Sequence, residues 1–254
     1  MGYPQGFLST RAVVKPGIFA VIPKEGLVNN VIPNIVGGKV SILCSPKIGA
    51  SFVQYIIEAD SNCHTTEAFG KEKGIESFLY LIEGEISIEL EGKSSVLTGG
   101  GYAYAPSDIG ISFKVSSKKA KILLYKQRYI PYKLCKPYSV IGNINDVEYR
   151  IYDEMSNVLI KDFLPTDDVA FDMNMHILSF KPGGCHPFVE THVQEHGMYI
   201  LSGEGAYLLE DQWMGIKKDD FIWMGAYCQQ AAYGVGRENF TYIYSKDCNR
   251  DVEL

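Results

Sequence analysis

One glutamate and two histidines stand close together in the segment 183–205, at a spacing typical of metal ligands. The pattern is Glu190-x-His192-x3-His196, and Gly203 follows after six further residues. Residues two apart point to the same face of a strand, so Glu190 and His192 would project together. A metal ion needs several side chains that converge on one point. This segment therefore predicts a metal site with Glu190, His192 and His196 among its ligands.

A second stretch with possible chemistry lies near the C-terminus, where Tyr242, Tyr244 and Lys246 would share one face of a strand. A lysine inside a folded protein is costly unless it meets an anion, so Lys246 is a candidate for binding an anionic ligand. The alternative is a lysine at the rim of the fold, in water.

The remaining histidines, His64, His176 and His186, fall outside the ligand spacing, and we expect none of them in the site. His64 lies in a polar loop, where it would be solvated. The six cysteines are scattered without a Cys-x-x-Cys pair, which favours reduced thiols over a disulfide framework. Cys185 lies near the ligands, but a small buried side chain is the better supported interpretation.

Strand signals dominate the chain that must position these residues. Short runs rich in Val, Ile, Tyr and Phe are separated by Gly, Pro, Asp and Asn, and no long segment has the apolar spacing of a helix. The clearest predicted strands are 51–59, 78–82, 85–90, 120–126, 173–180 and 240–245. With 46% hydrophobic and 12% aromatic residues, the chain is expected to form a packed all-β protein with little helix.

The sequence also matches itself, without gaps, at one fixed offset of 119 residues. Phe52 falls on Phe171, 80–85 on 199–204, 101–104 on 220–223, and Tyr125 on Tyr244. One offset over such a length predicts two copies of one all-β unit. We expect the first copy with an N-terminal arm in 1–135, a connection in 136–155, and the second copy in 156–254. Residues 1–40 would add edge strands or cross to the other domain.

Two all-β copies, with a His/Glu cluster ahead of a strand, a turn at Gly203 and a strand, resemble the cupin superfamily of small jelly-roll barrels. The resemblance implies two tandem cupin domains, a bicupin, with a metal inside a barrel. The segment from Glu190 to Gly203 keeps the spacing of the first cupin motif but exchanges its first histidine for glutamate and its glutamate for histidine. In the second motif, Gln230 stands where the histidine should be.

The repeat indicates which copy is active. The matched pairs are Glu190 with Lys71, His192 with Lys73, His196 with Ser77, and Gln230 with Ile111. The first copy has no such ligand at any of the four positions, and two of them are cations. We therefore expect a structural first barrel and an active second barrel.

The same offset sorts the residues near the C-terminus. Tyr244 falls on Tyr125, so it is expected to be structural. Tyr242 falls on Leu123 and Lys246 on Gln127, so both are specific to the second copy.

Two imidazoles, a carboxylate and an amide oxygen suit Mn²⁺ or Fe²⁺ better than a structural Zn²⁺. Four such ligands leave positions of an octahedron open for a substrate. Gln230 is the weakest of the four on chemistry alone, because glutamine is a poor ligand and Gln229 stands beside it.

Four longer runs are more specific than the cupin motifs: ETHVQEHG (190–197), MGAY (224–227), YGVGR (233–237) and YIYSKDCNRD (242–251). They resemble the (S)-ureidoglycine aminohydrolase family of bicupin enzymes, and the likeness extends to 1–3 and 49–53. The resemblance implies Mn²⁺ held by Glu190, His192, His196 and Gln230. It implies substrate contacts from Glu190, Gln230, Tyr242 and Lys246, with Tyr207 as an additional candidate.

The resemblance also implies the reaction, which is hydrolysis of (S)-ureidoglycine to (S)-ureidoglycolate and ammonia in purine and allantoin catabolism. Glu190, Lys246 and Tyr242 are then the candidate catalytic residues. Two other functions remain open: another metal-dependent cupin enzyme, such as an Fe²⁺ dioxygenase or a sugar isomerase, and a non-catalytic binding bicupin.

Composition excludes several partners. The formal charge is −6 and the cations are spread along the chain, which argues against nucleic acid or an anionic membrane as the main partner. No apolar stretch reaches the length of a membrane span, and the N-terminus lacks a signal pattern, so a cytoplasmic protein is expected. Barrel edges and the N-terminal arm favour a homo-oligomer.

Overall fold

The protein is built almost entirely of strands. The computed structural model describes residues 10–247 and 250–252, and its only helices there are two short 3-10 turns, η1 (Lys24–Gly26) and η2 (Ile144–Asp146). The predicted all-β class with little helix is confirmed. Residues 1–9 of the predicted arm and Cys248 lie outside the described part of the chain.

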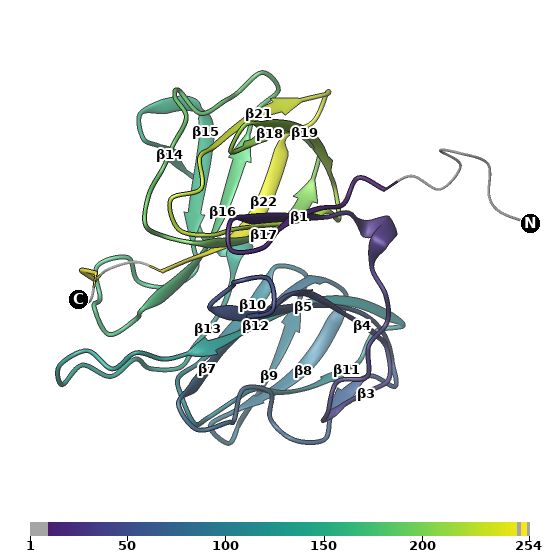
Figure 1. Cartoon of the computed structure of the whole chain (residues 1–254). Coiled ribbons are helices and arrows are strands. Elements are labelled where there is room, and N and C mark those ends of the chain that lie inside the picture. Colours follow the sequence, from purple (N-terminus) through teal and green to yellow (C-terminus); the bar gives the residue numbers. More distant parts are fainter. Residues whose placement is uncertain (1–9, 248–249, 253–254) are drawn as a thin grey trace, which may run out of the picture.

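The first barrel consists of two sheets packed face to face (Figure 1). Its six-stranded sheet has the order β13 (Val140–Asn143), β10 (Gly101–Ala105), β7 (Ile75–Glu83), β12 (Lys119–Arg128), β5 (Phe52–Asp60) and β4 (Lys39–Cys44). Its five-stranded sheet has the order β3 (Ile35–Val36), β6 (His64–Thr65), β11 (Ser112–Val115), β8 (Glu85–Leu90) and β9 (Lys93–Thr98). Alternate residues of these strands are apolar and point inward, so a continuous hydrophobic core fills the barrel.

The second barrel repeats this plan with a larger and a smaller sheet. The eight-stranded sheet has the order β1 (Val13–Lys15), β2 (Phe19–Ile22), β20 (Phe221–Met224), β17 (His196–Ser202), β22 (Phe240–Asp247), β16 (Met173–Phe180), β15 (Met155–Asp162) and β14 (Arg150–Tyr152). The three-stranded sheet has the order β19 (Gln212–Lys217), β18 (Glu204–Leu209) and β21 (Gln230–Val235). A second hydrophobic core lies between these two sheets.

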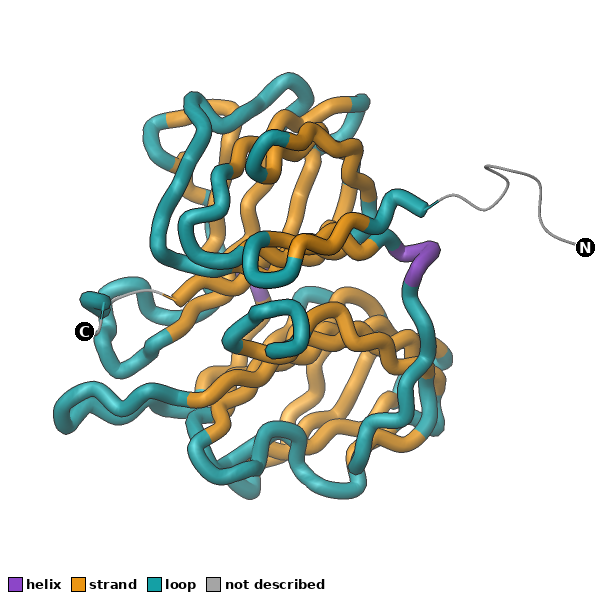
Figure 2. The backbone as a smooth tube through the Cα atoms, viewed as in Figure 1, coloured by secondary structure: helices purple, strands orange, loops and turns teal. Residues whose placement is uncertain are grey.

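A third hydrophobic core joins the barrels, which stack on each other through their large sheets (Figure 2). It is rich in aromatic residues. Phe163 from the second barrel packs edge-on against Phe78, Tyr80 and Tyr102 of the first, with ring centroids 4.8–5.4 Å apart. The barrels are therefore held together by the same dense apolar packing that holds each of them.

The N-terminal arm crosses from the first barrel to the second. Its strand β2 pairs with β20, so the β1–β2 hairpin extends the large sheet of the second barrel. The Arg11 guanidinium reinforces this pairing with two hydrogen bonds of 2.8 Å to the Asp220 carboxylate. In the segment 136–155, β13 joins the first barrel and β14 the second. The division into 1–135, 136–155 and 156–254 stays a prediction.

The strand pairing confirms the offset of 119 in the middle of each barrel. Ser77 of β7 pairs with Ala105 of β10, and His196 of β17 pairs with Met224 of β20. His196 therefore occupies in the second barrel the place that Ser77 occupies in the first.

The offset changes in the last strand of each barrel. Leu124 points into the first barrel and Tyr125 packs between the barrels, whereas Tyr244 points into the second barrel. The predicted match of Tyr244 with Tyr125 is therefore wrong, and Tyr244 takes the place of Leu124. The cause is one extra residue in the turn between β21 and β22, which spans 236–239 where the turn between β11 and β12 spans 116–118.

The first long strand of each barrel shifts as well. Phe52 pairs with Gln127 at the end of β12, and Met173 pairs with Asp247 at the end of β22. Phe52 therefore corresponds to Met173 and not to Phe171, as the ungapped offset predicts. Ser51 and Asp172, each one residue earlier, correspond in the same way.

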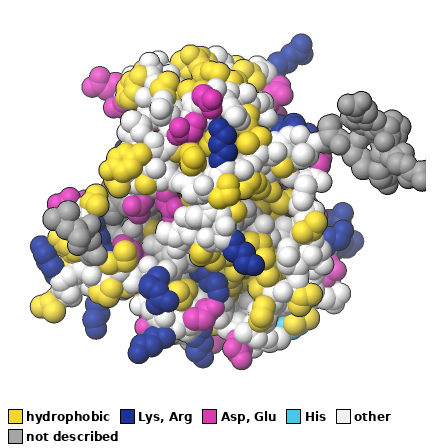
Figure 3. All heavy atoms as spheres, in the orientation of Figure 1, with side chains coloured by type: hydrophobic (Ala, Val, Ile, Leu, Met, Phe, Trp, Pro, Cys, Tyr) yellow, Lys and Arg dark blue, Asp and Glu magenta, His cyan; other side chains and the backbone are white. Residues whose placement is uncertain are grey.

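Within the described residues, no helix is long and apolar enough to cross a membrane. In Figure 3, cationic and anionic side chains are interspersed over both barrels, as expected for a chain without a basic run.

Candidate active site

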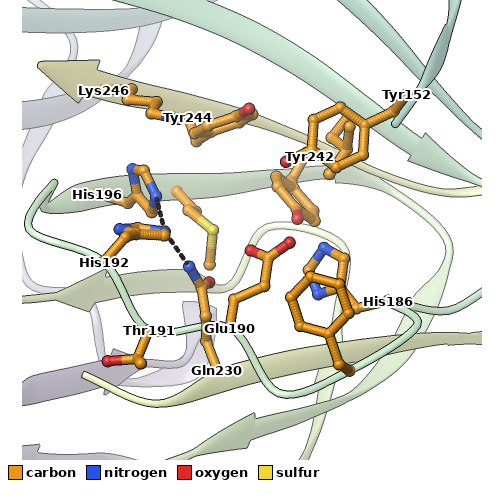
Figure 4. A pocket seen from close by; sticks show the side chains of 13 residues that line it. Tyr152, His186, Glu190, Thr191, His192, His196, Gln230, Tyr242, Tyr244 and Lys246 are labelled. Atoms are coloured by element: carbon orange, nitrogen blue, oxygen red, sulfur yellow. Dashed lines mark hydrogen bonds between the residues drawn. The ribbon is translucent and has the colours of Figure 1, made fainter. Parts of the chain in front are cut away.

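A pocket of about 220 Å³ lies inside the second barrel (Figure 4). Side chains from the segment 186–192 and from β17, β21 and β22 line it. It brings together all six predicted site residues, which are Glu190, His192, His196, Gln230, Tyr242 and Lys246. Residues more than fifty positions apart in the sequence thus meet at one cavity.

Strands fix the backbone of these residues. His196 begins β17 and Gln230 begins β21. Glu190 N donates to the Gln230 carbonyl at 2.8 Å, and Gln230 N donates to the Glu190 carbonyl at 2.9 Å. Tyr242 and Lys246 lie four residues apart on β22 and so share one face.

The two imidazoles present their nitrogens to one point. His192 Nδ1 lies 3.0 Å from the Gln194 carbonyl oxygen, and His196 Nδ1 lies 2.8 Å from the Ser245 carbonyl oxygen. A carbonyl oxygen only accepts, so each Nδ1 carries the proton and each Nε2 presents a lone pair. The two Nε2 atoms are 3.3 Å apart.

Both imidazoles are neutral. Burial lowers the pKa of His192, and it lowers the pKa of His196 well below its ordinary value. Two neutral rings with facing lone pairs have no proton to share between them. This arrangement suits a metal ion that both nitrogens bind, with the two carbonyl groups fixing the ring orientation.

Gln230 presents its amide to the same point. Its Nε2 lies 2.8 Å from His192 Nε2, and its Oε1 accepts a hydrogen bond of 2.8 Å from the Tyr207 hydroxyl. Half a turn of the amide places Oε1 beside the imidazoles and Nε2 beside that hydroxyl, which accepts as well as it donates. Tyr207 is fully buried behind Gln230, outside the residues that line the pocket.

The Glu190 carboxylate stands apart from the imidazoles and, in Figure 4, points toward the phenol of Tyr242. Within residues 10–247 and 250–252, no three His, Cys, Asp or Glu side chains lie close enough together to hold a metal ion. The donor set fits a divalent ion in its chemistry, since two imidazoles and an amide already converge and the Glu190 carboxylate lines the same pocket.

The electrostatic setting of Glu190 favours its protonated form. Burial raises the pKa of this carboxyl group, and the nearby Lys246 cation only partly opposes that effect. A carboxylate with a raised pKa is a better proton acceptor than one in water.

Phenols and one cation line the rest of the pocket. Burial raises the pKa values of Tyr242 and Tyr244 well above the ordinary value, and that of Tyr152 to about 12. All three phenols are therefore hydrogen-bond donors near neutral pH. Lys246 has no carboxylate within ion-pair distance in the described part of the chain, so its ammonium group is available to an anionic ligand.

His186 lines the pocket, although its position falls outside the ligand spacing. It is only 6% exposed, burial lowers its pKa to about 4, and its Nδ1 has no partner among the described residues. The sequence signal was a spacing of two: positions 186, 188, 190 and 192 all line the pocket. Tyr152 is a second unexpected lining residue, and no local motif indicates it.

The residues expected away from the site are placed as follows. His176 is buried outside the pocket lining, with Nδ1 2.8 Å from Asp162 Oδ1, in agreement with its structural interpretation. His64 is half-buried in the short strand β6 and not fully solvated as predicted. The cysteines of the described segments are free thiols, namely Cys44, Cys63, Cys135, Cys185 and Cys228.

The chain resembles proteins of known activity and known structure. No protein-family model matches it. An (S)-ureidoglycine aminohydrolase from Escherichia coli K12 is 50% identical over 255 residues, which cover 100% of this chain and 97% of that protein. The crystal structure of the protein YlbA from E. coli has a TM-score of 0.88 at 47% identity and covers 100% of both chains.

A more distant likeness concerns the fold alone. The oxalate decarboxylase of Bacillus subtilis, a bicupin, has a TM-score of 0.67 at 11% identity, covering 95% of this chain and 80% of that one. This confirms the predicted tandem cupin architecture. Since the 50% identity extends over the whole chain, the protein belongs to the (S)-ureidoglycine aminohydrolase family.

Proposed function

We propose that this protein hydrolyses (S)-ureidoglycine to (S)-ureidoglycolate and ammonia, with Mn²⁺ as its cofactor. The observation that carries the proposal is the pocket itself. In a chain of this family, two neutral imidazoles, an amide, a carboxylate and a cation without a carboxylate partner among the described residues surround one small cavity. Glu190, His192, His196 and Gln230 would hold the ion, which supplies Lewis acidity and a fixed point of attachment for the substrate.

Lys246 and the phenols would orient the substrate. Ureidoglycine carries a carboxylate, which can pair with the Lys246 ammonium group inside the pocket. This ion pair replaces the water that would otherwise solvate the lysine. Tyr242 and Tyr152 are protonated donors that can bind the ureido carbonyl. The substrate is thereby held at both ends, which fixes the stereoisomer and the bond presented for cleavage.

Glu190 would select the amine as the leaving group. The reacting carbon bears an amino and a ureido nitrogen, and either can depart. In the hydrolysis, a C–O bond to water forms and the C–N bond to the amine breaks, while a proton moves from water to the amine nitrogen. Glu190 is suited to carry that proton, because its carboxyl group faces the pocket and burial raises its pKa.

The direct test uses the purified protein with Mn²⁺ and freshly prepared ureidoglycine. Ammonia release is measured after subtraction of the spontaneous decay of the substrate, and the ureidoglycolate is resolved on a chiral column while dissolved O₂ is monitored. We expect enzyme-dependent ammonia, the S product and constant O₂. Racemic product at the background rate contradicts the proposal, and O₂ consumption favours a dioxygenase.

Glu190→Gln tests the proton role separately from metal binding. The amide oxygen can still bind a metal ion but cannot accept a proton, so we expect Mn²⁺ binding to persist while turnover falls by about 10²–10⁴-fold. A variant that keeps both Mn²⁺ and full turnover would show that Glu190 moves no proton.

A further inference from the structure

We infer that the first barrel positions the ligand-bearing segment of the second, through a contact between Ser51 and Glu195 that makes both of them positioning residues. The inference rests on the proposed Mn²⁺ site. It gives the first barrel, whose own equivalent positions hold no ligands, a part in the activity of its partner.

The contact immobilises both oxygens of one carboxylate. Ser51, just before β5 of the first barrel, donates to Glu195 Oε1 from its backbone N at 2.8 Å and also from its hydroxyl. Trp223 Nε1 donates to Glu195 Oε2 at 3.3 Å. Glu195 stands in the sequence between the two histidines, directly before His196. A fixed Glu195 side chain therefore fixes the backbone from which the His196 ring projects.

The residue after His196 is held by the first barrel too. A Cβ atom on Gly197 would lie 2.4 Å from Gln54 Oε1 and 2.6 Å from Phe52 Cε2, both on β5 of the first barrel. A side chain at position 197 would therefore collide with these two side chains unless both moved. His196 is thus flanked on both sides by residues that contact the other barrel.

The contact also reaches β22, the strand that pairs with β17 in the large sheet. The Glu195 backbone N donates to Asp247 Oδ1 at 3.3 Å, and Asp247 follows Lys246 on β22. His196 Nδ1 and Gly197 N bind the Ser245 carbonyl and hydroxyl on the same strand, at 2.8 and 3.0 Å. A shift of Glu195 would therefore move the imidazole relative to the substrate-facing strand.

The repeat supplies an internal comparison. Glu76 precedes Ser77 as Glu195 precedes His196, and the Tyr104 hydroxyl donates to Glu76 Oε2 at 2.5 Å where Trp223 donates to Glu195. Asp172 of the second barrel, the counterpart of Ser51, interacts with Glu76. The interface thus contains two related carboxylate contacts, of which one adjoins a proposed ligand and the other adjoins a serine.

The experiment compares Ser51→Ala, Glu195→Gln and, as matched control, Glu76→Gln. For each full-length protein, the Kd for Mn²⁺ is measured by titration with the metal alone, followed by the EPR signal of free Mn²⁺, and the Tm of the metal-free protein is recorded. We expect Glu195→Gln to weaken Mn²⁺ binding by about tenfold or more, the scale on which supporting residues act at metal sites. Ser51→Ala should act less strongly in the same direction, and the double variant should be no worse than Glu195→Gln alone. Glu76→Gln should change Tm but leave Kd within about twofold.

Unchanged Mn²⁺ affinity in both Ser51→Ala and Glu195→Gln overturns the inference, as does equal weakening in Glu76→Gln, which would indicate general loosening of the barrels. If Glu195→Gln fails to fold, Ser51→Ala decides, because it removes one hydroxyl from an exposed residue. A wild-type protein that binds Mn²⁺ and responds to these substitutions, yet releases no ammonia, supports the positioning contact and contradicts the proposed function. A wild-type protein that releases ammonia, while Ser51→Ala and Glu195→Gln bind Mn²⁺ with unchanged affinity, supports the proposed function and contradicts the positioning contact.

Discussion

The interior of the first barrel is closed where the interior of the second is open. Ile111, Ile122 and Leu124 are fully buried in the hydrophobic core of the first barrel. In the second barrel the corresponding positions are Gln230, Tyr242 and Tyr244, which line the pocket together with His196. The two barrels share strand order and most of their register, so a few side chains decide whether these interior positions are packed with apolar groups or lined with polar ones.

The polar pocket of the second barrel lacks hydrophobic stabilisation that the first barrel has at the same positions. Apolar side chains at these positions contribute packing and hydrophobic stabilisation, whereas imidazole, amide and phenol groups require hydrogen-bond partners once they are buried. The second barrel supplies those partners from its own backbone and from Tyr207, and its neighbour supplies the packing around His196. The apolar core of the first barrel thus adjoins a second barrel whose pocket is lined by polar groups.

The largest expected difference in Mn²⁺ binding and ammonia release is between substitutions at His196 and at Ser77, which occupy equivalent positions in the two barrels. His196→Ala removes an imidazole that no other side chain can replace, so we expect loss of measurable Mn²⁺ binding and ammonia release at the spontaneous rate. Ser77→Ala removes a hydrogen bond of 3.2 Å to the Phe69 carbonyl, at a cost of about 1 kcal/mol in the free energy of unfolding. Titration with Mn²⁺ and the ammonia assay check both, and an inactive Ser77→Ala protein that is folded would break the comparison.

A smaller effect is expected at Lys246 and Lys126. The strand pairing aligns these two lysines, so the predicted match of Lys246 with Gln127 is wrong. Lys246→Met removes the proposed partner of the substrate carboxylate, and we expect kcat/KM for ureidoglycine to fall by about 10–100-fold, mainly through KM. Lys126 is paired with Glu72 and lies over the Phe69 ring, 5.4 Å from its centroid, so Lys126→Met should leave kcat/KM unchanged. Steady-state kinetics of the two variants decide this, and equal losses would contradict the assignment of Lys246.

The smallest effect concerns the pH dependence of stability at Glu76. Burial, with the charge of Asp172 as the next cause, raises the pKa of Glu76 well above its ordinary 4.5, so the folded protein keeps a proton that the unfolded chain releases. The free energy of unfolding therefore falls as pH rises from about 4.5 toward the folded pKa, by up to about 1.4 kcal/mol per pH unit for this proton. Glu76→Gln has no such proton, so its stability relative to the wild type should improve with pH, as measured by urea unfolding. A difference independent of pH would show that Glu76 is already ionised in the folded state.

The two carboxylate contacts at the interface differ in the groups that meet them. Ser51 offers hydrogen-bond donors to Glu195, whereas Asp172 offers only another carboxylate to Glu76. Burial raises the pKa of both carboxyl groups. The charge of Asp172 adds to that effect at Glu76, whereas the Ser51 and Trp223 donors oppose it at Glu195.

Much of the site could be predicted because its signals are local. Glu190, His192 and His196 stand close together in the sequence and all line one pocket, although 191–195 form a loop and not the expected strand. The repeat aligned Gln230 with Ile111. This correctly indicated that the first barrel has an apolar side chain where the second has a polar one. The family resemblance on whole runs of residues then agreed with the 50% identity found over the chain.

The predictions that were wrong, and the residues that were missed, have physical explanations. One residue added in a turn reverses which side chains of the next strand face inward, so an ungapped match assigned Tyr125 to Tyr244 when their side chains point to different cores. Tyr152 and Ser51 reach the site region from segments distant in the sequence, where only tertiary packing brings them close. Glu195 had a sequence signal that was missed, since a glutamate stands at the matching position of both copies.

The crossing of the N-terminal arm has a consequence for the order of folding. Phe19 on β2 pairs with Met224 on β20, 205 residues further along the chain. During synthesis β2 must remain without its partner strand until both barrels have been almost completely translated. Contacts this far apart in sequence close slowly, and an unpaired edge strand is a place where chains associate wrongly. The large sheet of the second barrel is therefore completed late, by a segment made long before it.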